Sequence, residues 1–378
     1  MKNNCFASVA AVGILLAAGH GAQAAPAPPP TSFEELLGAA KSSMTADPAT
    51  AFARSDEALK LAQKATESPE RRLRVATAQW LEGEALLRLN RAAEAAPLLA
   101  ESVSAVEAVQ PNTTLHGRVL MAQATVLLEQ GHLDRALAGL QAAQRIFASA
   151  RDRRGEAMAL QNIGSIYYEA GEFSKVLGCY AQAAEVYPGE PGLLVIAYNN
   201  RANALKELGR YDEAEVEFLR ALGVAEQMGS TVLRARILSN LAASQVRAAR
   251  LEAAEVTLAQ ALNLSEADPA AREWRTYLLG VSAQAALQRG NSPLAARLLG
   301  RMFEAVDPQT TGVIYREFHE AASQAYGHVG DARLAAEHQR AAERLGRGHY
   351  QLASASAGCG AGAAVRVALA RSLNGGGN

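Results

Sequence analysis

Apolar positions along the chain recur with the spacing of amphipathic helices. In residues 197–227, two apolar stripes with a period near 3.6 residues flank a short segment around Gly209. This arrangement predicts a helix, a turn and a second helix. Sustained alternation of Val, Ile, Thr and aromatic residues, which would indicate β-strands, does not occur. The pattern therefore predicts an all-α fold.

Small residues recur with a longer period, near 40 residues. An anchor position is occupied by Ala39, Gly83, Ala124, Gly164, Ala202, Ala242, Ala283 and Ser323. Twelve residues after each anchor stand Ala51, Ala95, Ala136, Val176, Ala214, Ala254, Ala295 and Ala335, and nineteen after it stand Ala58, Ser102, Ala143, Ala183, Ala221, Ala261, Met302 and Ala342. Small side chains let neighbouring helices approach closely. The period predicts about eight antiparallel helical hairpins.

A turn position follows each anchor by seven residues. It is occupied by Ala46, Asn90, Gly131, Gly171, Gly209, Ala249, Gly290 and Gly330. Six of these eight are Gly or Asn, which enter the left-handed conformation at a helix end more easily than other residues do. The position is therefore expected to end the first helix of each hairpin.

The chain resembles the tetratricopeptide repeat (TPR) family most closely in residues 160–188. The resemblance rests on Gly164, Tyr167, Gly171, Phe173, Val176, Tyr180, Ala183 and Pro188. It implies a right-handed superhelical solenoid whose concave face, lined by first helices, binds peptides or partner proteins. The TPR period is about 34 residues, so either the helices or the turns must be longer here. HEAT-like repeats share the longer period but do not explain the residues of the turn.

Asparagine recurs on the first helices, two residues before the anchor, as Asn162, Asn200 and Asn240; Asn199 and Asn203 share a helical face beside Asn200. Asparagine is a mediocre helix former, so its recurrence needs a reason. Similar asparagines in long-period TPR proteins imply that these amides hold the backbone of an extended peptide. Alternatively, they bond to the neighbouring repeat and stabilise the superhelix. The five residues are the candidate ligand-binding site.

No motif indicates catalysis, a cofactor or a metal site. "GCGAG" at residues 358–362 lacks the preceding strand and third glycine of a nucleotide-binding loop. The histidines lack the paired spacing of metal ligands, and acidic pairs such as Asp212–Glu213 and Glu215–Glu217 are expected at solvated positions. A formal net charge of −1 gives no reason to expect nucleic acid or an anionic membrane as partner. A non-catalytic protein is expected.

The two ends of the chain differ in composition from the repeats. Residues 1–24 combine one Lys, a short apolar run and Ala22-Gln23-Ala24, which predicts a signal peptide cleaved after Ala24. The alternative is a retained N-terminal anchor. A Pro-rich linker is expected at residues 25–32, the solenoid at 33–345 and a Gly-rich flexible tail at 346–378. Cys179 and Cys359 are expected to be free thiols, and the mature chain to have no membrane span.

Three function classes remain open, the third being an enzyme, for which no motif in the sequence supplies the catalytic groups. The first is a periplasmic or secreted non-catalytic scaffold that binds a peptide or protein in its concave groove. The second is a sensor or input module, because arrays of this length behind a signal sequence resemble the periplasmic TPR sensor regions of bacterial diguanylate cyclases. In that case the membrane and catalytic parts are absent from this chain.

Overall fold

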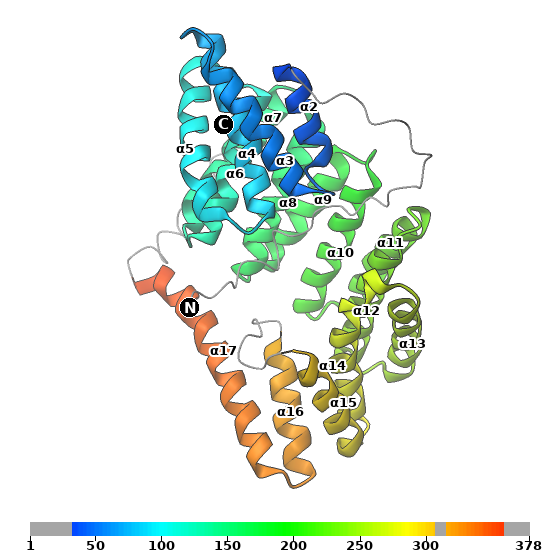
Figure 1. Ribbon diagram of the computed structural model, residues 1–378. Helices are drawn as coiled ribbons and strands as arrows, with labels where there is room; N and C mark the ends of the chain where they lie inside the picture. The colour runs from blue at the N-terminus through cyan, green and yellow to red at the C-terminus, as the bar shows by residue number, and fades with distance from the viewer. Residues whose placement is uncertain (1–31, 307–314, 359–378) are drawn as a thin grey trace. The chain divides into compact units, whose positions relative to one another are not determined.

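The computed structural model describes residues 32–306 and 315–358, and all regular secondary structure in these residues is helical (Figure 1). The predicted signal peptide, nearly all of the predicted linker, and residues 359–378 of the predicted tail lie outside the described residues. None of the described helices is both long enough and apolar enough to cross a bilayer.

The chain forms two compact units that divide between Leu193 and Leu194. The N-terminal unit contains α2 (Phe33–Ser43), α3 (Pro48–Gln63), α4 (Pro69–Arg88), α5 (Ala92–Val109), α6 (Thr114–Glu129), α7 (Leu133–Ser149), α8 (Arg153–Glu169) and α9 (Phe173–Val186). The C-terminal unit contains nearly all of α10 (Pro191–Glu207), then α11 (Tyr211–Gln227), α12 (Thr231–Arg247), α13 (Leu251–Ala267), the 3₁₀ helix η1 (Pro269–Ala271), α14 (Glu273–Gln288), α15 (Ser292–Ala305), α16 (Arg316–His328) and α17 (Ala332–Gly358).

Consecutive helices of the described residues follow one another as hairpins, and packing between the two helices is seen in α2/α3, α4/α5, α6/α7, α8/α9, α12/α13, α14/α15 and α16/α17, which confirms the predicted all-α array of about eight hairpins. The long period is explained by long helices: α11, α12 and α13 each have 17 residues and are joined by residues 228–230 and 248–250. Helix α17 continues beyond residue 345, where the array is predicted to end.

The small-residue positions are buried as the period predicts in the six inner hairpins. Ala202, Ala214 and Ala221, for example, are fully buried in the α10/α11 hairpin. The anchor was assigned one residue too early in the first hairpin and one residue too late in the last, because Ala40 and Ala322 are fully buried there while Ala39 and Ser323 are partly exposed. These hairpins lack a neighbour on one side within the described residues, so their burial pattern is less constrained.

The turn position adopts a left-handed backbone in seven of the eight hairpins. Asn90, Gly131, Gly171, Gly209, Ala249, Gly290 and Gly330 have φ between 58° and 87°. Ala249, at φ 58°, differs from the other six, which are Gly or Asn, because a residue with an alanine side chain is strained in this region. Ala46 lies in the shorter first hairpin, where the turn has a different form.

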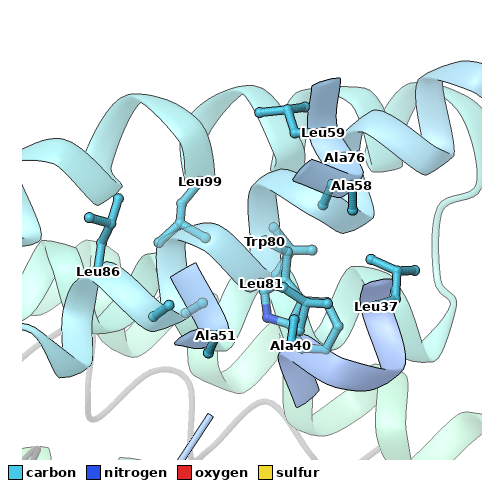
Figure 2. Packing of buried hydrophobic residues seen from close by; sticks show 14 of the residues in the cluster. Leu37, Ala40, Ala51, Ala58, Leu59, Ala76, Trp80, Leu81, Leu86 and Leu99 are labelled. Carbon is cyan, nitrogen blue, oxygen red and sulfur yellow. The ribbon is translucent and has the colours of Figure 1, made fainter. Parts of the chain in front are cut away.

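The core of the N-terminal unit interleaves alanine with leucine and tryptophan. Figure 2 shows part of this cluster, with Ala40 of α2 close to Trp80 and Leu81 of α4, and with Ala51 and Ala58 of α3 among the other buried residues. Close approach also requires glycine at Gly83 and Gly164: an added Cβ would lie 2.6 Å from the Leu99 side chain and 2.8 Å from the Tyr180 ring, respectively. Because glycine has no side chain, the facing side chain packs directly against the backbone, and this contact sets the distance between the helices at these anchors.

The first helices of successive hairpins contact each other within each unit. In the C-terminal unit α12 contacts α14, and α14 contacts α16, whereas each second helix packs mainly against the first helices before and after it. Because the first helices are the more closely spaced, they form the inner face of the stack. Side chains on this face of α10, α12, α14 and α16 are the candidates for a binding site.

Candidate ligand-binding face of the C-terminal unit

Four of the five predicted asparagines form one hydrogen-bonded group, in which Asn200, Asn203 and Asn240 each bond to Asn199. The Asn199 side chain is 2% exposed, and its Nδ2 donates to Asn200 Oδ1 at 3.0 Å. Asn240 Nδ2 of α12 donates to Asn199 Oδ1 at 3.0 Å. Asn203 Nδ2 donates to the Asn199 carbonyl oxygen at 3.0 Å, one turn earlier in α10.

The Asn199–Asn240 bond joins the first helices of two neighbouring hairpins, which is the arrangement expected of residues that stabilise the stack. Asn200, Asn203 and Asn240 nevertheless keep part of their surface exposed. Asn162 belongs to α8 of the N-terminal unit and is half-buried, and no hydrogen bond of its side chain is found among the described residues. A role of these amides in ligand binding stays a prediction.

A partly buried ionic group lies one to two turns further along the same helices. Arg247 Nη1 donates to both carboxylate oxygens of Glu207, at 2.9 and 3.0 Å, and so joins α12 to α10. Lys206 Nζ lies 3.5 Å from Glu207 and is 8% exposed, while Glu317 of α16 lies 3.9 Å from Arg247. The group therefore links first helices from three hairpins.

Burial changes the acidity of two groups in this network. Desolvation lowers the pKa of Lys206, although the neighbouring Glu207 acts against it. Desolvation also raises the pKa of Tyr277 on α14, with the nearby carboxylates of Glu317 and Glu207 adding to the effect. Tyr277 therefore stays a neutral hydrogen-bonding group at neutral pH.

A cleft of about 530 Å³ opens beside this network on the inner face of α12, α14 and α16. Its lining is mixed, with Val246, Arg247, Gln284, Leu287, Gln288, Arg316, Glu317, Glu320, Ala321 and Gln324. Gln288 Nε2 donates to the Val246 carbonyl, and Arg316 pairs with Glu320 at 2.9 Å. Among the described residues, the amides of Gln284 and Gln324 have no hydrogen-bond partner. The lining of the cleft thus combines unused amide groups with apolar side chains.

The asparagine pattern missed this part of the inner face. Glu207, Arg247 and Gln288 each lie five residues after an anchor, and two helical turns after the position of Asn200 and Asn240. A spacing of seven residues returns to the same helical face. Polar residues at that spacing were the available signal.

The expectation that Glu215–Glu217 is solvated was wrong for Glu217. Its side chain on α11 is 5% exposed and lies 2.9 Å from Arg220 and 3.5 Å from Arg201. Glu215 accepts hydrogen bonds from Gln245 and Arg250 of the next hairpin. Both carboxylates therefore belong to contacts between helices, and neither is a free acid.

Other reactive groups of the described residues do not assemble a second site. No group of three or more potential metal ligands occurs among them. Burial raises the pKa of the Cys179 thiol to about 11, so it is protonated and unreactive at neutral pH. Cys359 lies outside the described residues. A pairing that sequence spacing did not indicate joins His319 to His338, whose Nδ1 atoms are 2.9 Å apart.

Comparison with known proteins agrees with this fold. Residues 115–189 and 193–267 each match the tetratricopeptide repeat family model, so this part of the chain consists of TPR units. No curated protein matches the chain.

Solved structures share the fold at low sequence identity. RapI in its apo form is 14% identical with a TM-score of 0.64, and the match covers 83% of this chain and 97% of that chain. The apo form of the quorum sensor NprR from B. thuringiensis is 13% identical with a TM-score of 0.65, covering 83% and 88%. A Rap protein complexed with competence and sporulation factor is 14% identical with a TM-score of 0.55, covering 85% and 100%.

Proposed function

We propose that this protein is a non-catalytic scaffold that binds an extended peptide or protein segment on the inner face of the C-terminal unit. The observation that carries the proposal is the cleft of about 530 Å³ on α12, α14 and α16, with the unpaired amides of Gln284 and Gln324. Side-chain amides both donate and accept, so they match the backbone of an extended chain. The Rap protein solved with competence and sporulation factor supports the proposal, because a factor is bound to a related fold.

The asparagines extend this amide-rich face to α10. Asn200 and Asn240 lie on successive first helices and are partly exposed, so they are proposed to contact the same ligand. Asn199 is buried and holds Asn240 in place through their 3.0 Å hydrogen bond. Its proposed role is to orient the amides that a ligand meets. Asn162 is the corresponding candidate in the N-terminal unit.

The test separates ligand contact from stabilisation of the stack. A randomised heptapeptide library serves as the probe, with Gln284→Ala, Gln324→Ala as the double variant and Gln339→Ala, on α17 outside the cleft lining, as control. Each lost amide bond is worth about 0.5 to 1.5 kcal/mol, so the double variant should weaken binding of selected peptides about tenfold or more with an unchanged Tm. Undiminished binding would remove the cleft from the site.

Asn240→Ala should behave differently, because it leaves the buried Asn199 oxygen without its partner. The expected loss of stability is about 1 to 3 kcal/mol, measured by thermal unfolding. A stable Asn240→Ala variant that no longer retains peptides would instead assign this asparagine a direct binding role.

Export is part of the proposal. The residues at the N-terminus favour a secreted or periplasmic protein whose mature chain begins at Ala25. N-terminal sequencing of the protein from its native host tests this, and an intact Met1 end in the cytosol would contradict it.

A sensor role is the second candidate. One neighbour is a signal transduction ATPase with numerous domains from Pyrococcus horikoshii, with a TPR sensor, which is 16% identical with a TM-score of 0.60. The match covers 78% of this chain but 44% of that one, so a similar array forms part of a larger signalling protein there. This favours an input-module role for the array, as in diguanylate cyclases. A membrane helix and signalling domain encoded just past Asn378 would support it.

A further inference from the structure

The last hairpin contains a buried pair of histidines next to the cleft. His319 of α16 is fully buried and His338 of α17 nearly so, with their Nδ1 atoms 2.9 Å apart. Phe303 of α15 packs against both rings, with centroids 4.5 Å from His319 and 4.6 Å from His338. Three helices therefore meet at these two imidazoles.

The contact between two nitrogens limits how many protons the pair holds. A hydrogen bond between the Nδ1 atoms needs one N–H and one lone pair, which neutral imidazoles provide. One added proton on the outer nitrogen of the donor ring leaves this bond intact. When both rings are imidazolium, both Nδ1 atoms carry a hydrogen, and two positive charges adjoin in a buried space. The doubly protonated pair is incompatible with the packed hairpin.

The surroundings oppose protonation. Burial lowers the pKa of His319 to about 4, and the positive charges of His338 and Arg344 act in the same direction. Burial also lowers the pKa of His338, against the attraction of Glu337. Two further described groups that face the pair are uncharged: Phe303 of α15, and Tyr326 of α16, whose ring stacks on His338 with centroids 5.6 Å apart.

The pair is coupled to the cleft through α16. His319 lies between Glu317 and Glu320, both of which line the cleft. Phe318, the adjacent residue, packs against Tyr277 of α14 with ring centroids 5.3 Å apart. A displacement of α16 from α17 would therefore move one wall of the cleft relative to α14.

We propose that the His319–His338 pair is an acid-sensitive latch: when both imidazoles are protonated, α16 separates from α17 and the cleft releases its ligand. The ligand half of this inference rests on the proposed peptide-binding function. The conformational half is independent of any ligand. Release would take place in acid and reverse on return to neutral pH.

Tryptophan fluorescence tests the conformational half. The chain has two tryptophans, Trp80 and Trp274, so a Trp80→Phe background leaves Trp274 as the reporter. Trp274 packs against Tyr277, with centroids 6.3 Å apart, and Tyr277 in turn packs on Phe318 of α16. The expected result is a reversible change in Trp274 emission as the pH falls towards 4, where His319 takes up a proton.

The decisive variant is His338→Asn, because asparagine can still bond to His319 Nδ1 but cannot become charged. It should move the transition to lower pH by at least about one pH unit, and His319→Asn should do the same if the first variant folds poorly. His328→Asn, on the exposed end of α16, is the matched control and should leave the midpoint unchanged. An identical transition in all variants, or loss of helical circular dichroism in step with it, overturns the latch.

Heptapeptides selected from a randomised library at pH 7.5 test the ligand half. The wild type should release them at pH 4 and His338→Asn should retain them. Retention by both proteins overturns the inference but leaves the proposed function standing. Failure to select any peptide at pH 7.5 refutes the proposed function, and with it the ligand half, while the fluorescence result still decides whether the latch opens.

Discussion

The two units place their ion pairs differently. In the N-terminal unit most pairs are local: Arg54 with Glu57, Lys60 with Asp56, and Arg91 with Glu94 lie three or four residues apart. Arg118–Asp152 and Arg154–Glu190 are the exceptions that join hairpins. In the C-terminal unit, pairs between hairpins recur: Arg247 with Glu207, Arg250 with Asp212 and Glu215, and Arg289 with Glu252 and Glu255.

The difference shows that contacts between hairpins of the same repeat can be stabilised in two ways. Side chains pack directly over glycines in both units, as Phe147 does at Gly117 and Gly155 and Phe318 does at Gly280, but in the N-terminal unit the ion pairs are mostly local surface pairs that add little. In the C-terminal unit, charges on the inner face connect hairpins and also border the cleft. The second arrangement leaves polar groups available to a ligand, which is why the candidate site lies there.

The largest expected difference between the units is their response to pH. Burial raises the pKa of Glu82 on α4 to about 7, with Asp56 acting in the same direction and Lys60 against it, and Glu82 is 8% exposed. The folded state thus binds a proton that the unfolded chain releases near pH 4.5. Stability from this proton is complete below pH 4.5 and is lost as pH rises through 7, by about 3 kcal/mol in total. The histidine pair predicts the opposite sign, a loss as pH falls from 6.5 towards 4.

Hydrogen exchange resolved by helix measures both trends in the intact chain. After correction for intrinsic rates, protection of α3 and α4 should fall between pH 5 and pH 8, while protection of α16 and α17 should fall below pH 6. Glu82→Gln should flatten the first trend and leave the second. Parallel trends in both regions would show that the buried groups do not control local stability.

The second test compares a pair between hairpins with a local one. Arg247→Met leaves the partly buried Glu207 with Lys206 as its nearest cation, at 3.5 Å, and should lower stability by about 2 kcal/mol. Arg54→Met removes an exposed pair within α3 and should cost no more than about 0.5 kcal/mol. Urea unfolding of both variants decides. Equal losses would mean that the pairs between hairpins do not stabilise the stack.

The sequence predicted the repeat register because close packing demands small residues at fixed intervals. Ala214 and Ala254, fully buried twelve residues after their anchors, required no knowledge of distant contacts. The predicted anchor was wrong by one residue at Ala40 and Ala322, because an end hairpin packs against a neighbouring hairpin on one side only. The prediction that Glu217 is exposed to solvent was wrong, although the helical pattern indicates burial. Glu217 lies three residues after Ala214 and four before Ala221, and so on the buried face of α11.

The candidate site was predicted only in part. The recurrent asparagines lie on first helices of the repeats, as their spacing predicts, but their partners depend on how one hairpin meets the next, as the Asn199–Asn240 bond shows. The pairing of His319 with His338 depends on the packing of α16 against α17, which no local pattern encodes. Contacts between repeats are therefore where sequence periodicity stops being informative.

The smallest expected effect concerns the turn at Ala249, which precedes Arg250 and its pairs with Asp212 and Glu215. Alanine at φ 58° is strained by about 1 kcal/mol or more, and glycine removes this strain but makes the unfolded chain more flexible. Ala249→Gly should therefore raise stability by about 0.5 to 1 kcal/mol, seen as a higher Tm. Gly209→Ala, at φ 72° in the preceding hairpin, should lower stability by a similar amount. If Ala249→Gly is instead destabilising, the ion pairs of Arg250 need a rigid residue before them. In that case the turn positions the charges between the hairpins, and these charges do not by themselves stabilise the turn.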